Sequence, residues 1–208
     1  MNLIILFDFG GVVGKHHQDP AEKELMTTFG VDRDTIKMLL SEKSEHGSAF
    51  RANLITEKQF WDQVCKLSGR QNLTIDNYSA LSMIFAQTYV YDYDLLEIIA
   101  ELRTYCKVGI LTNIDYARSN YLLSQLEIKK HFDLYHPSYI FNSHKRESKF
   151  WTILNDELSA TFPNYQVVYV DDKEEHVSSA KKVGWIGIHH IDNENTKSEI
   201  MKRVHNKV

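Results

Sequence analysis

The first dozen residues constrain the fold more than any other stretch of the chain. An unbroken apolar run, residues 3–7, ends at one carboxylate, Asp8, and the glycines Gly10 and Gly11 follow after Phe9. The run is too apolar for a surface strand and too short and glycine-bounded for a helix, so it predicts a strand buried on both faces, as in a parallel sheet. Asp8 then lies at the carboxyl end, where open α/β sheets bind ligands. An aspartate there also forms turns or caps helices, so Asp8 alone leaves both interpretations open.

Composition and charge restrict the class of protein. The 208 residues are 43% hydrophobic and 25% charged, as in soluble globular proteins. The net charge of −4 gives no general attraction to nucleic acid or acidic lipid. We see no signal peptide and no stretch that could span a membrane, so we expect a cytoplasmic protein. Cys65 and Cys106 form no Cys-x-x-Cys pair and are expected as reduced thiols. The sequence does not indicate an oligomeric state.

Strand-like and helical segments alternate through the second half of the chain, as a parallel sheet requires. Further strands are predicted at residues 107–111, 139–141, 167–170 and 186–189. Roughly ninety residues of helical pattern separate the first two strands, whereas a crossover needs only a dozen or more. The excess predicts an inserted helical module. We therefore expect an α/β fold: a Rossmann-like parallel sheet of about five strands, with helices on both faces, over residues 1–14 and 90–208, and a helical insert over residues 15–89.

Capping residues mark several helix starts. Asp32 precedes one apolar-periodic stretch, Thr56 begins a capping box, and Asp94 precedes a third helix. Another helix is predicted at about residues 76–88. Aromatic residues of the insert have helical spacing, which favours packing in its core over lining a substrate site: Phe50, Phe60 and Trp61.

Polar residues follow three of the predicted strands at the point where each strand ends. They are Asp8, the pair Thr112 and Asn113, and the pair Asp171 and Asp172. Parallel strands place their carboxyl ends at one edge, so these groups should meet. Two carboxylates about 4 Å apart repel by about 4 kcal/mol at an effective dielectric near 20, so such a cluster predicts a bound cation. Carboxylates without His or Cys suit a hard ion, Mg²⁺ before Ca²⁺.

In order and placement, these residues resemble the motifs of the haloacid dehalogenase-like hydrolase superfamily, mostly phosphatases with an aspartate nucleophile. The first motif is an aspartate after a hydrophobic strand, here Asp8, and the second is a Thr or Ser that ends the next core strand, here Thr112. The third is a lysine, here Lys145, and the fourth is a strand that ends in acids, here Asp171 and Asp172. The resemblance covers nearly the whole chain.

The resemblance implies a role for each group. Asp8 would attack phosphorus and form an aspartyl-phosphate, while Lys145 would neutralise charge and orient both partners. Thr112 and the amide of Asn113 would hydrogen-bond the phosphoryl oxygens. The implied ligands of Mg²⁺ are Asp8, the carbonyl of Gly10, Asp172 and, directly or behind them, Asp171. The insert would be a cap domain, since residues 55–61 resemble the start of a cap helix, and the substrate a small phosphorylated metabolite.

Three positions depart from the motifs. Most phosphatases of the superfamily carry a second aspartate, the general acid and base, where this chain has Gly10. An Asp-x-Gly subgroup, which includes phosphatases of the glucose-1-phosphate type, resembles the chain here. General acid–base help is worth about 10²–10⁴ in rate, so its loss allows a slow enzyme. His16 or His17 is a candidate proton donor. Arg146 replaces the usual proline after the motif lysine, and His176 replaces the usual Asn or Asp after the acids.

Three functions therefore stay open. The first is a Mg²⁺-dependent phosphatase of a small metabolite, such as a sugar phosphate, that acts through Asp8. The second is a catalytically impaired member that binds a phosphorylated ligand or a partner, which the residues Gly10, Arg146 and His176 motivate. The third is a 2-haloacid dehalogenase, which uses a similar carboxylate attack without a metal. Neither nucleic acid nor a membrane is expected as a partner.

Overall fold

A five-stranded parallel sheet forms the centre of the computed structural model, which describes residues 2–16, 19–73, 78–87 and 89–205. The strand order is β5–β4–β1–β6–β7, and every neighbouring pair is parallel. The strands are β1 (Asn2–Phe7), β4 (Lys107–Thr112), β5 (Leu134–Pro137), β6 (Tyr165–Asp171) and β7 (Ile186–His189). The α/β fold class expected from the sequence is confirmed.

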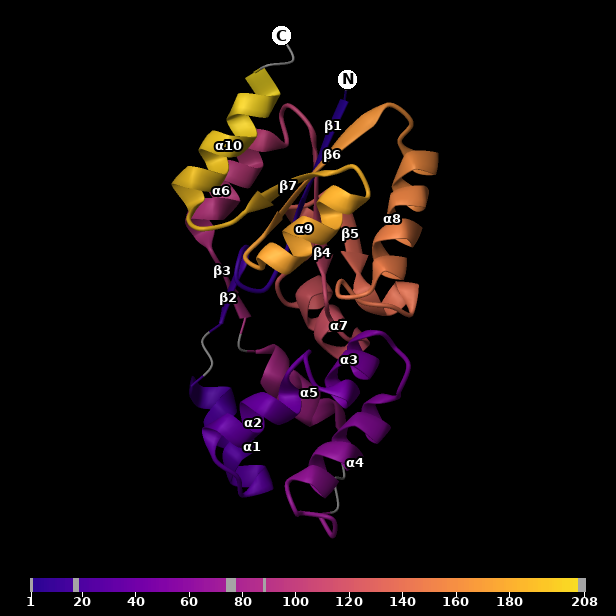
Figure 1. Ribbon diagram of the computed structural model, residues 1–208. Coiled ribbons are helices and arrows are strands. Elements are labelled where there is room, and N and C mark those ends of the chain that lie inside the picture. Colours follow the sequence, from indigo (N-terminus) through magenta and orange to yellow (C-terminus); the bar gives the residue numbers. More distant parts are fainter. Residues whose placement is uncertain (1, 17–18, 74–77, 88, 206–208) are drawn as a thin grey trace.

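Strand β1 is buried on both faces, which explains its unbroken apolar run. Leu3, Ile5 and Phe7 belong to one hydrophobic cluster, and Ile4 and Leu6 belong to another. Successive side chains of a strand point to opposite faces, so each cluster covers one face of the sheet. Helices cover both faces of the sheet (Figure 1). Helices α6 (Tyr93–Leu102) and α10 (Asn193–His205) lie on one side, and α8 (Ser148–Thr161) and α9 (Glu174–Lys182) lie on the other.

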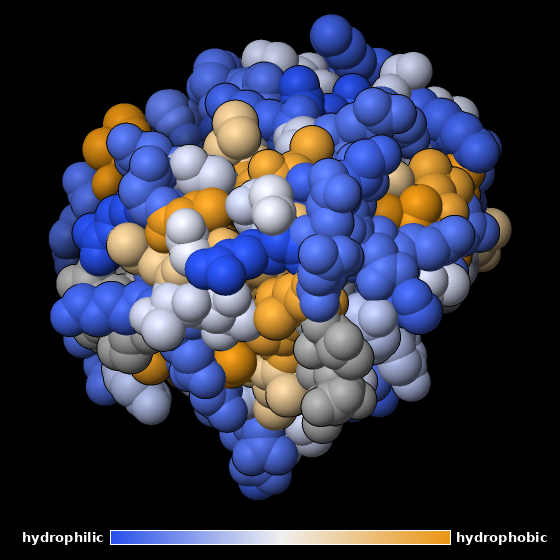
Figure 2. All heavy atoms as spheres, turned by 90° about the horizontal axis from the view of Figure 1, so that it is seen from below, coloured by the Kyte–Doolittle hydropathy of each residue, from blue (hydrophilic) through white to orange (hydrophobic). Residues whose placement is uncertain are grey.

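The helices described between β2 and β3 form a separate unit, here called the helical module, beyond the carboxyl ends of the strands (Figure 1). Its own apolar cluster includes the stacked rings of Phe29 and Trp61, 5.8 Å apart, and the rings of Phe50 and Phe60, 4.5 Å apart. These aromatic residues are core residues, as expected. On the face seen in Figure 2, apolar side chains lie in separate patches among hydrophilic ones. The helices are α1 (Asp19–Phe29), α2 (Arg33–Leu40), α3 (Glu45–Arg51), α4 (Glu57–Leu67) and α5 (Tyr78–Ala86).

The two chain segments that flank the module pair with each other. Strands β2 (Gly14–His16) and β3 (Tyr89–Tyr91) form an antiparallel two-stranded ribbon. The sequence did not predict this ribbon, because three residues are too few to establish an alternating pattern. Residue 17, one of the two histidines considered as proton donors, lies outside the described residues.

Two sequence predictions were wrong in position. Residues predicted as a strand at 139–141 form the short 3₁₀ helix η2 (Ser138–Phe141), and the strand is β5, just before it. Strand β5 is an edge strand that contains histidine and ends in proline, so it lacks the apolar run of a central strand. The helix predicted from Asp94 begins earlier, because the side chain of Asp92 caps α6 through the amide of Leu95.

Other local predictions were confirmed. Asp32 accepts a hydrogen bond from the amide of Thr35 at the start of α2, and Thr56 and Gln59 form the capping box of α4. The helix predicted near residues 76–88 corresponds to α5 within the described residues. After β4 the chain forms α7 (Tyr116–Ser124) and η1 (Ile128–Lys130), which contribute Leu122 and Ile128 to the core. Neither cysteine forms a disulfide in the part of the chain that the structure describes. Within the described residues, no helix is both long and apolar enough to cross a bilayer.

His136 in β5 should make the fold sensitive to acid. Burial lowers its pKa from 6.5 to about 4, and its Nε2 has no hydrogen-bond partner among the described residues. The unfolded chain therefore binds a proton below pH 6.5 that the folded protein does not bind until about pH 4. Stability should fall by roughly 3 kcal/mol as the pH drops through this window. Urea unfolding at several pH values should show a smaller loss in His136→Gln. An unchanged loss in that variant, or an equal reduction in the exposed control His189→Gln, would contradict this assignment.

Candidate active site

The chain turns sharply directly after β1. The amide of Asp8 still donates to the carbonyl of Val170, at 2.8 Å. The amide of Gly14 donates a hydrogen bond back to the carbonyl of Phe9, which closes the turn. Gly11 lies in this turn with φ +89°, and a Cβ atom there would lie 2.6 Å from Oδ2 of Asp172. Glycine is therefore required at position 11, because the backbone passes against a carboxylate in a conformation that other residues rarely adopt.

The three acidic residues predicted to converge do so. Asp8, Asp171 and Asp172 each offer an oxygen that lies within 4.8 Å of the other two. Oδ1 of Asp172 is buried and has no hydrogen-bond partner among the described residues. Three carboxylates around one point, with one unsatisfied buried oxygen, fit a hard divalent cation such as Mg²⁺.

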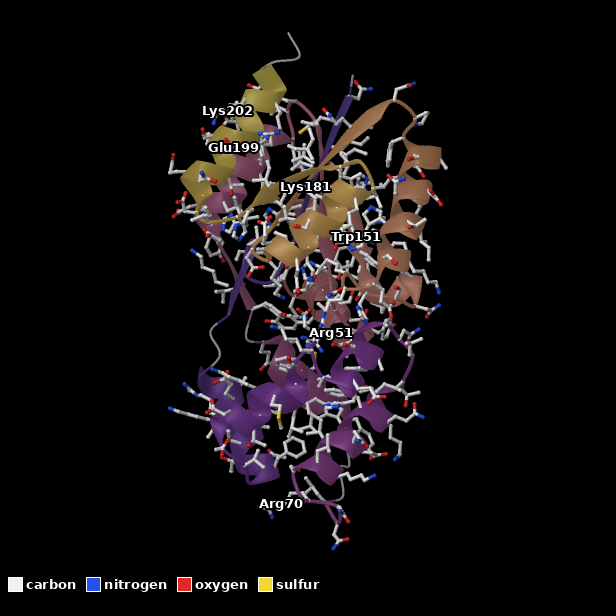
Figure 3. All side chains as sticks on the ribbon, in the orientation of Figure 1. Arg51, Arg70, Trp151, Lys181, Glu199 and Lys202 are labelled. Atoms are coloured by element: carbon white, nitrogen blue, oxygen red, sulfur yellow. The ribbon has the colours of Figure 1, made fainter. Side chains whose placement is uncertain are left out.

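Lys145 is the cation that the protein itself supplies to this cluster. Its Nζ lies 2.7 Å from Oδ1 of Asp8 and 2.9 Å from Oδ2 of Asp171, and its side chain is only 1% exposed. Within the basic segment 144–149, only Lys145 is buried. The backbone amide of Lys145 donates to Oδ1 of Asn113, and its carbonyl accepts from Nε1 of Trp151 in α8, which is labelled in Figure 3. Hydrogen bonds therefore hold the backbone of Lys145, and ion pairs hold its ammonium group.

The charges of this cluster are unevenly balanced. Burial raises the pKa of Asp171, but Lys145 and His176 outweigh that effect and hold the pKa well below its usual range. Burial lowers the pKa of Lys145, and the charges of Asp171 and Asp8 outweigh it, so the pKa is raised. Burial, opposed by Lys145 and reinforced by Asp171, raises the pKa of Asp8 to about 6. Asp8 is therefore the carboxylate whose charge is less well compensated, and an added cation would relieve it.

Two residues that the sequence did not assign to the site hold Asp171 in place. Nδ1 of His176 lies 3.0 Å from Oδ2 of Asp171, and the hydroxyl of Tyr169 donates to the same oxygen. Oδ1 of Asp171 accepts from the amide of Lys173. With both oxygens engaged, Asp171 is suited to position Lys145 behind the metal ligands. The His176 departure noted in the sequence therefore acts on Asp171, not directly on Lys145.

Thr112 and Asn113 lie next to this cluster at the end of β4. Both line, with Asp8, Gly10 and Lys145, a cavity of about 330 Å³. Thr112 is 5% exposed. The residues that the sequence assigned to the nucleophile, the phosphate contacts, the lysine and the acid cluster therefore lie at this edge of the sheet.

The far wall of the cavity comes largely from the helical module, and the sequence did not predict it. Leu25, Ile36 and Leu40 supply apolar surface, and Glu42 and Arg51 supply charge. Figure 3 labels Arg51 at the junction of module and core. Nothing in the local sequence marks these residues, because their position depends on how the module packs over the sheet.

The fold itself has known relatives, although neither a protein-family model nor a curated protein sequence matches the chain. A haloacid dehalogenase family enzyme from Bacteroides thetaiotaomicron, solved with magnesium and inorganic phosphate, superposes with a TM-score of 0.70 over 91% of this chain and 94% of that one, at 15% identity. A predicted hydrolase of the same kind from Porphyromonas gingivalis gives 0.73 over 99% and 98%, at 17% identity. The chain has the fold of the haloacid dehalogenase-like hydrolases.

The same haloacid dehalogenase-like fold extends to a different reaction. The L-2-haloacid dehalogenase from Xanthobacter autotrophicus, solved with chloropropionic acid covalently bound, matches with a TM-score of 0.63 over 89% of this chain and 76% of that one, at 17% identity. The superfamily resemblance noted in the sequence is confirmed at the level of fold. These comparisons do not distinguish the Asp-x-Gly subgroup.

Replacing Lys145 should expose the electrostatic strain of the acid cluster. Lys145→Met would leave Asp8 and Asp171 buried and facing each other without their cation, which we expect to cost about 3–5 kcal/mol of unfolding free energy in urea. Lys58→Met removes an exposed lysine 2.6 Å from Asp62 and should cost less than about 1 kcal/mol. Equal losses in the two variants would show that Lys145 does not compensate the cluster.

Proposed function

We propose that the protein is a Mg²⁺-dependent phosphatase that hydrolyses a small phosphorylated metabolite through an aspartyl-phosphate on Asp8. The observation that carries the proposal is the convergence of Asp8, Asp171, Asp172 and Lys145 beside a 330 Å³ cavity that Asp8 and Lys145 line. A nucleophilic carboxylate, a divalent-cation site and a buried ammonium are the groups that phosphoryl transfer between two anions needs. The size of the cavity favours a small substrate.

Each side chain of the site has its own proposed role. Lys145 and the amide of Phe9 both contact Oδ1 of Asp8, so Oδ2 is the oxygen proposed to attack phosphorus. The P–O bond to the leaving group then breaks, and a water molecule later cleaves the aspartyl-phosphate. Thr112 and the backbone amide of Asn113 donate to the phosphoryl oxygens. Bound by Asp8, the Gly10 carbonyl and Asp172, Mg²⁺ would supply positive charge to those oxygens.

The helical module is proposed as a cap, with residues 15–89 as its extent and 1–14 and 90–208 as the hydrolase core. The ribbon of β2 and β3 places both connections side by side, which suits a hinge. A cap over the cavity would exclude water and select the leaving group. The subgroup likeness makes sugar phosphates the first substrates to test.

The second candidate is dehalogenation of a 2-haloacid, which the match to the Xanthobacter autotrophicus dehalogenase favours. A carboxylate attack at carbon would also use Asp8. The presence of Asp172, with its unpartnered buried oxygen, favours the metal-dependent reaction instead.

A phosphate-release screen over a panel of sugar phosphates, acyl phosphates and other small esters tests the proposal. Release should require Mg²⁺, stop on chelation, and fall to the uncatalysed background in Asp8→Asn, because the amide cannot form an acyl-phosphate. Absence of release from every ester would contradict the proposal. Chloride release from 2-chloropropionate without Mg²⁺ would establish the dehalogenase, and tight binding of an ester without turnover would establish a binding protein.

A further inference from the structure

The proposed reaction needs a proton donor from elsewhere in the chain, because Gly10 occupies the position of the usual acid. Cleavage of a phosphate ester leaves an alkoxide unless an acid protonates it. Three carboxylates line the cavity within the described residues: Asp8, Glu22 and Glu42. Asp8 is the proposed nucleophile, and Glu22 is engaged inside the module, 3.0 Å from Nε of Arg33. Glu42 remains as the carboxylate to consider.

Glu42 extends from the module onto the core. It lies in the turn between α2 and α3, where its carbonyl accepts from the hydroxyl of Ser48 at 2.6 Å. Its Oε1 lies 2.6 Å from Nζ of Lys173, and its Oε2 accepts from Nδ2 of Asn113 at 3.2 Å. The side chain is 17% exposed. The carboxylate therefore lies within hydrogen-bond distance of a residue proposed to bind the phosphoryl group.

Glu42 lies on the side of the phosphoryl site toward which the leaving oxygen should point. In phosphoryl transfer the attacking and leaving oxygens lie roughly in line across phosphorus. Since Asp8 attacks from the sheet, the leaving oxygen faces the module. Glu42 is the module carboxylate that reaches this side of the phosphoryl site among the described residues.

We propose that Glu42 is the general acid and base of the reaction, in place of the aspartate that Gly10 lacks. This inference rests on the proposed phosphatase function. In the first step the bond from Asp8 to phosphorus forms, the ester P–O bond breaks, and the leaving oxygen keeps the electron pair and takes the proton of Glu42. In the second step the Glu42 carboxylate takes a proton from the water that attacks phosphorus, and Asp8 leaves as a carboxylate.

Binding of the phosphate group should raise the pKa of Glu42 and so allow it to be protonated. Four cations from four different segments act on this carboxylate: Lys173, Arg51, Lys145 and Arg118. Despite burial, they lower the pKa of Glu42 to about 2 when no ligand is bound. A phosphate dianion that engages Lys145 and Lys173 neutralises them and adds negative charge beside Glu42, so the pKa rises and the side chain takes up a proton.

Leaving-group dependence provides the first test. Glu42→Gln keeps the shape of the side chain but cannot give up a proton. With an alkyl phosphate such as glucose 6-phosphate, kcat/KM, which reports the first step and not the hydrolysis of the shared aspartyl-phosphate, should fall about 10²–10⁴-fold. With p-nitrophenyl phosphate, whose leaving group needs no protonation, kcat/KM should lose less than about tenfold. The matched control Glu22→Gln should leave the ratio of the two rates unchanged. Equal losses on both esters in Glu42→Gln, or faster turnover of both, would overturn the proposal.

Proton uptake provides a second test that needs no turnover. Sulfate is a dianion at every pH near neutrality, so protons taken up when it binds in the presence of Mg²⁺ come to the protein. Calorimetry near pH 6 in two buffers of different ionisation enthalpy should show about one proton taken up by the wild type and clearly less by Glu42→Gln. Equal uptake by the two proteins would overturn the proposal. If the wild type released no phosphate from any ester, the phosphatase function would fail instead, which keeps the two failures distinct.

Discussion

The concentration of negative charge at the end of β1 and β6 is the constraint on which the rest of the site depends. Three carboxylates meet within 4.8 Å, and one buried lysine compensates only part of their charge. The neighbouring structure serves to keep that lysine and Asp171 in place: Tyr169 and His176 bind Asp171, and Trp151 binds the backbone of Lys145. A cluster built in this way favours a divalent cation and an anionic ligand.

Residues near strand ends were predictable from the sequence, because parallel strands bring their carboxyl ends to one edge. An unbroken apolar run identified β1, and similar runs identified β4 and β6. The edge strand β5 was misplaced, since its histidine and proline hide the pattern. Glu42 and Arg51 could not be predicted as site residues, because only the packing of the module over the sheet brings them to the cavity.

Gly10 cannot act as an acid, and Glu42 is proposed to take that role. Gly10 lines the cavity and offers no acid there. Glu42, the carboxylate proposed as proton donor, comes from the module and contacts the core through Lys173 and Asn113. On this account, protonation chemistry depends on the cap being closed, so binding of the leaving group and catalysis are coupled through the same side chain.

The most direct test of the central claim is to trap the covalent intermediate. Wild-type protein mixed with Mg²⁺ and a substrate from the screen would be quenched in acid within one turnover, digested, and analysed by mass spectrometry. The peptide that contains Asp8 should carry one phosphoryl group, which should be absent from Asp8→Asn and from samples without substrate. Turnover without any phosphorylated peptide, or with the phosphoryl group on another residue, would contradict the account.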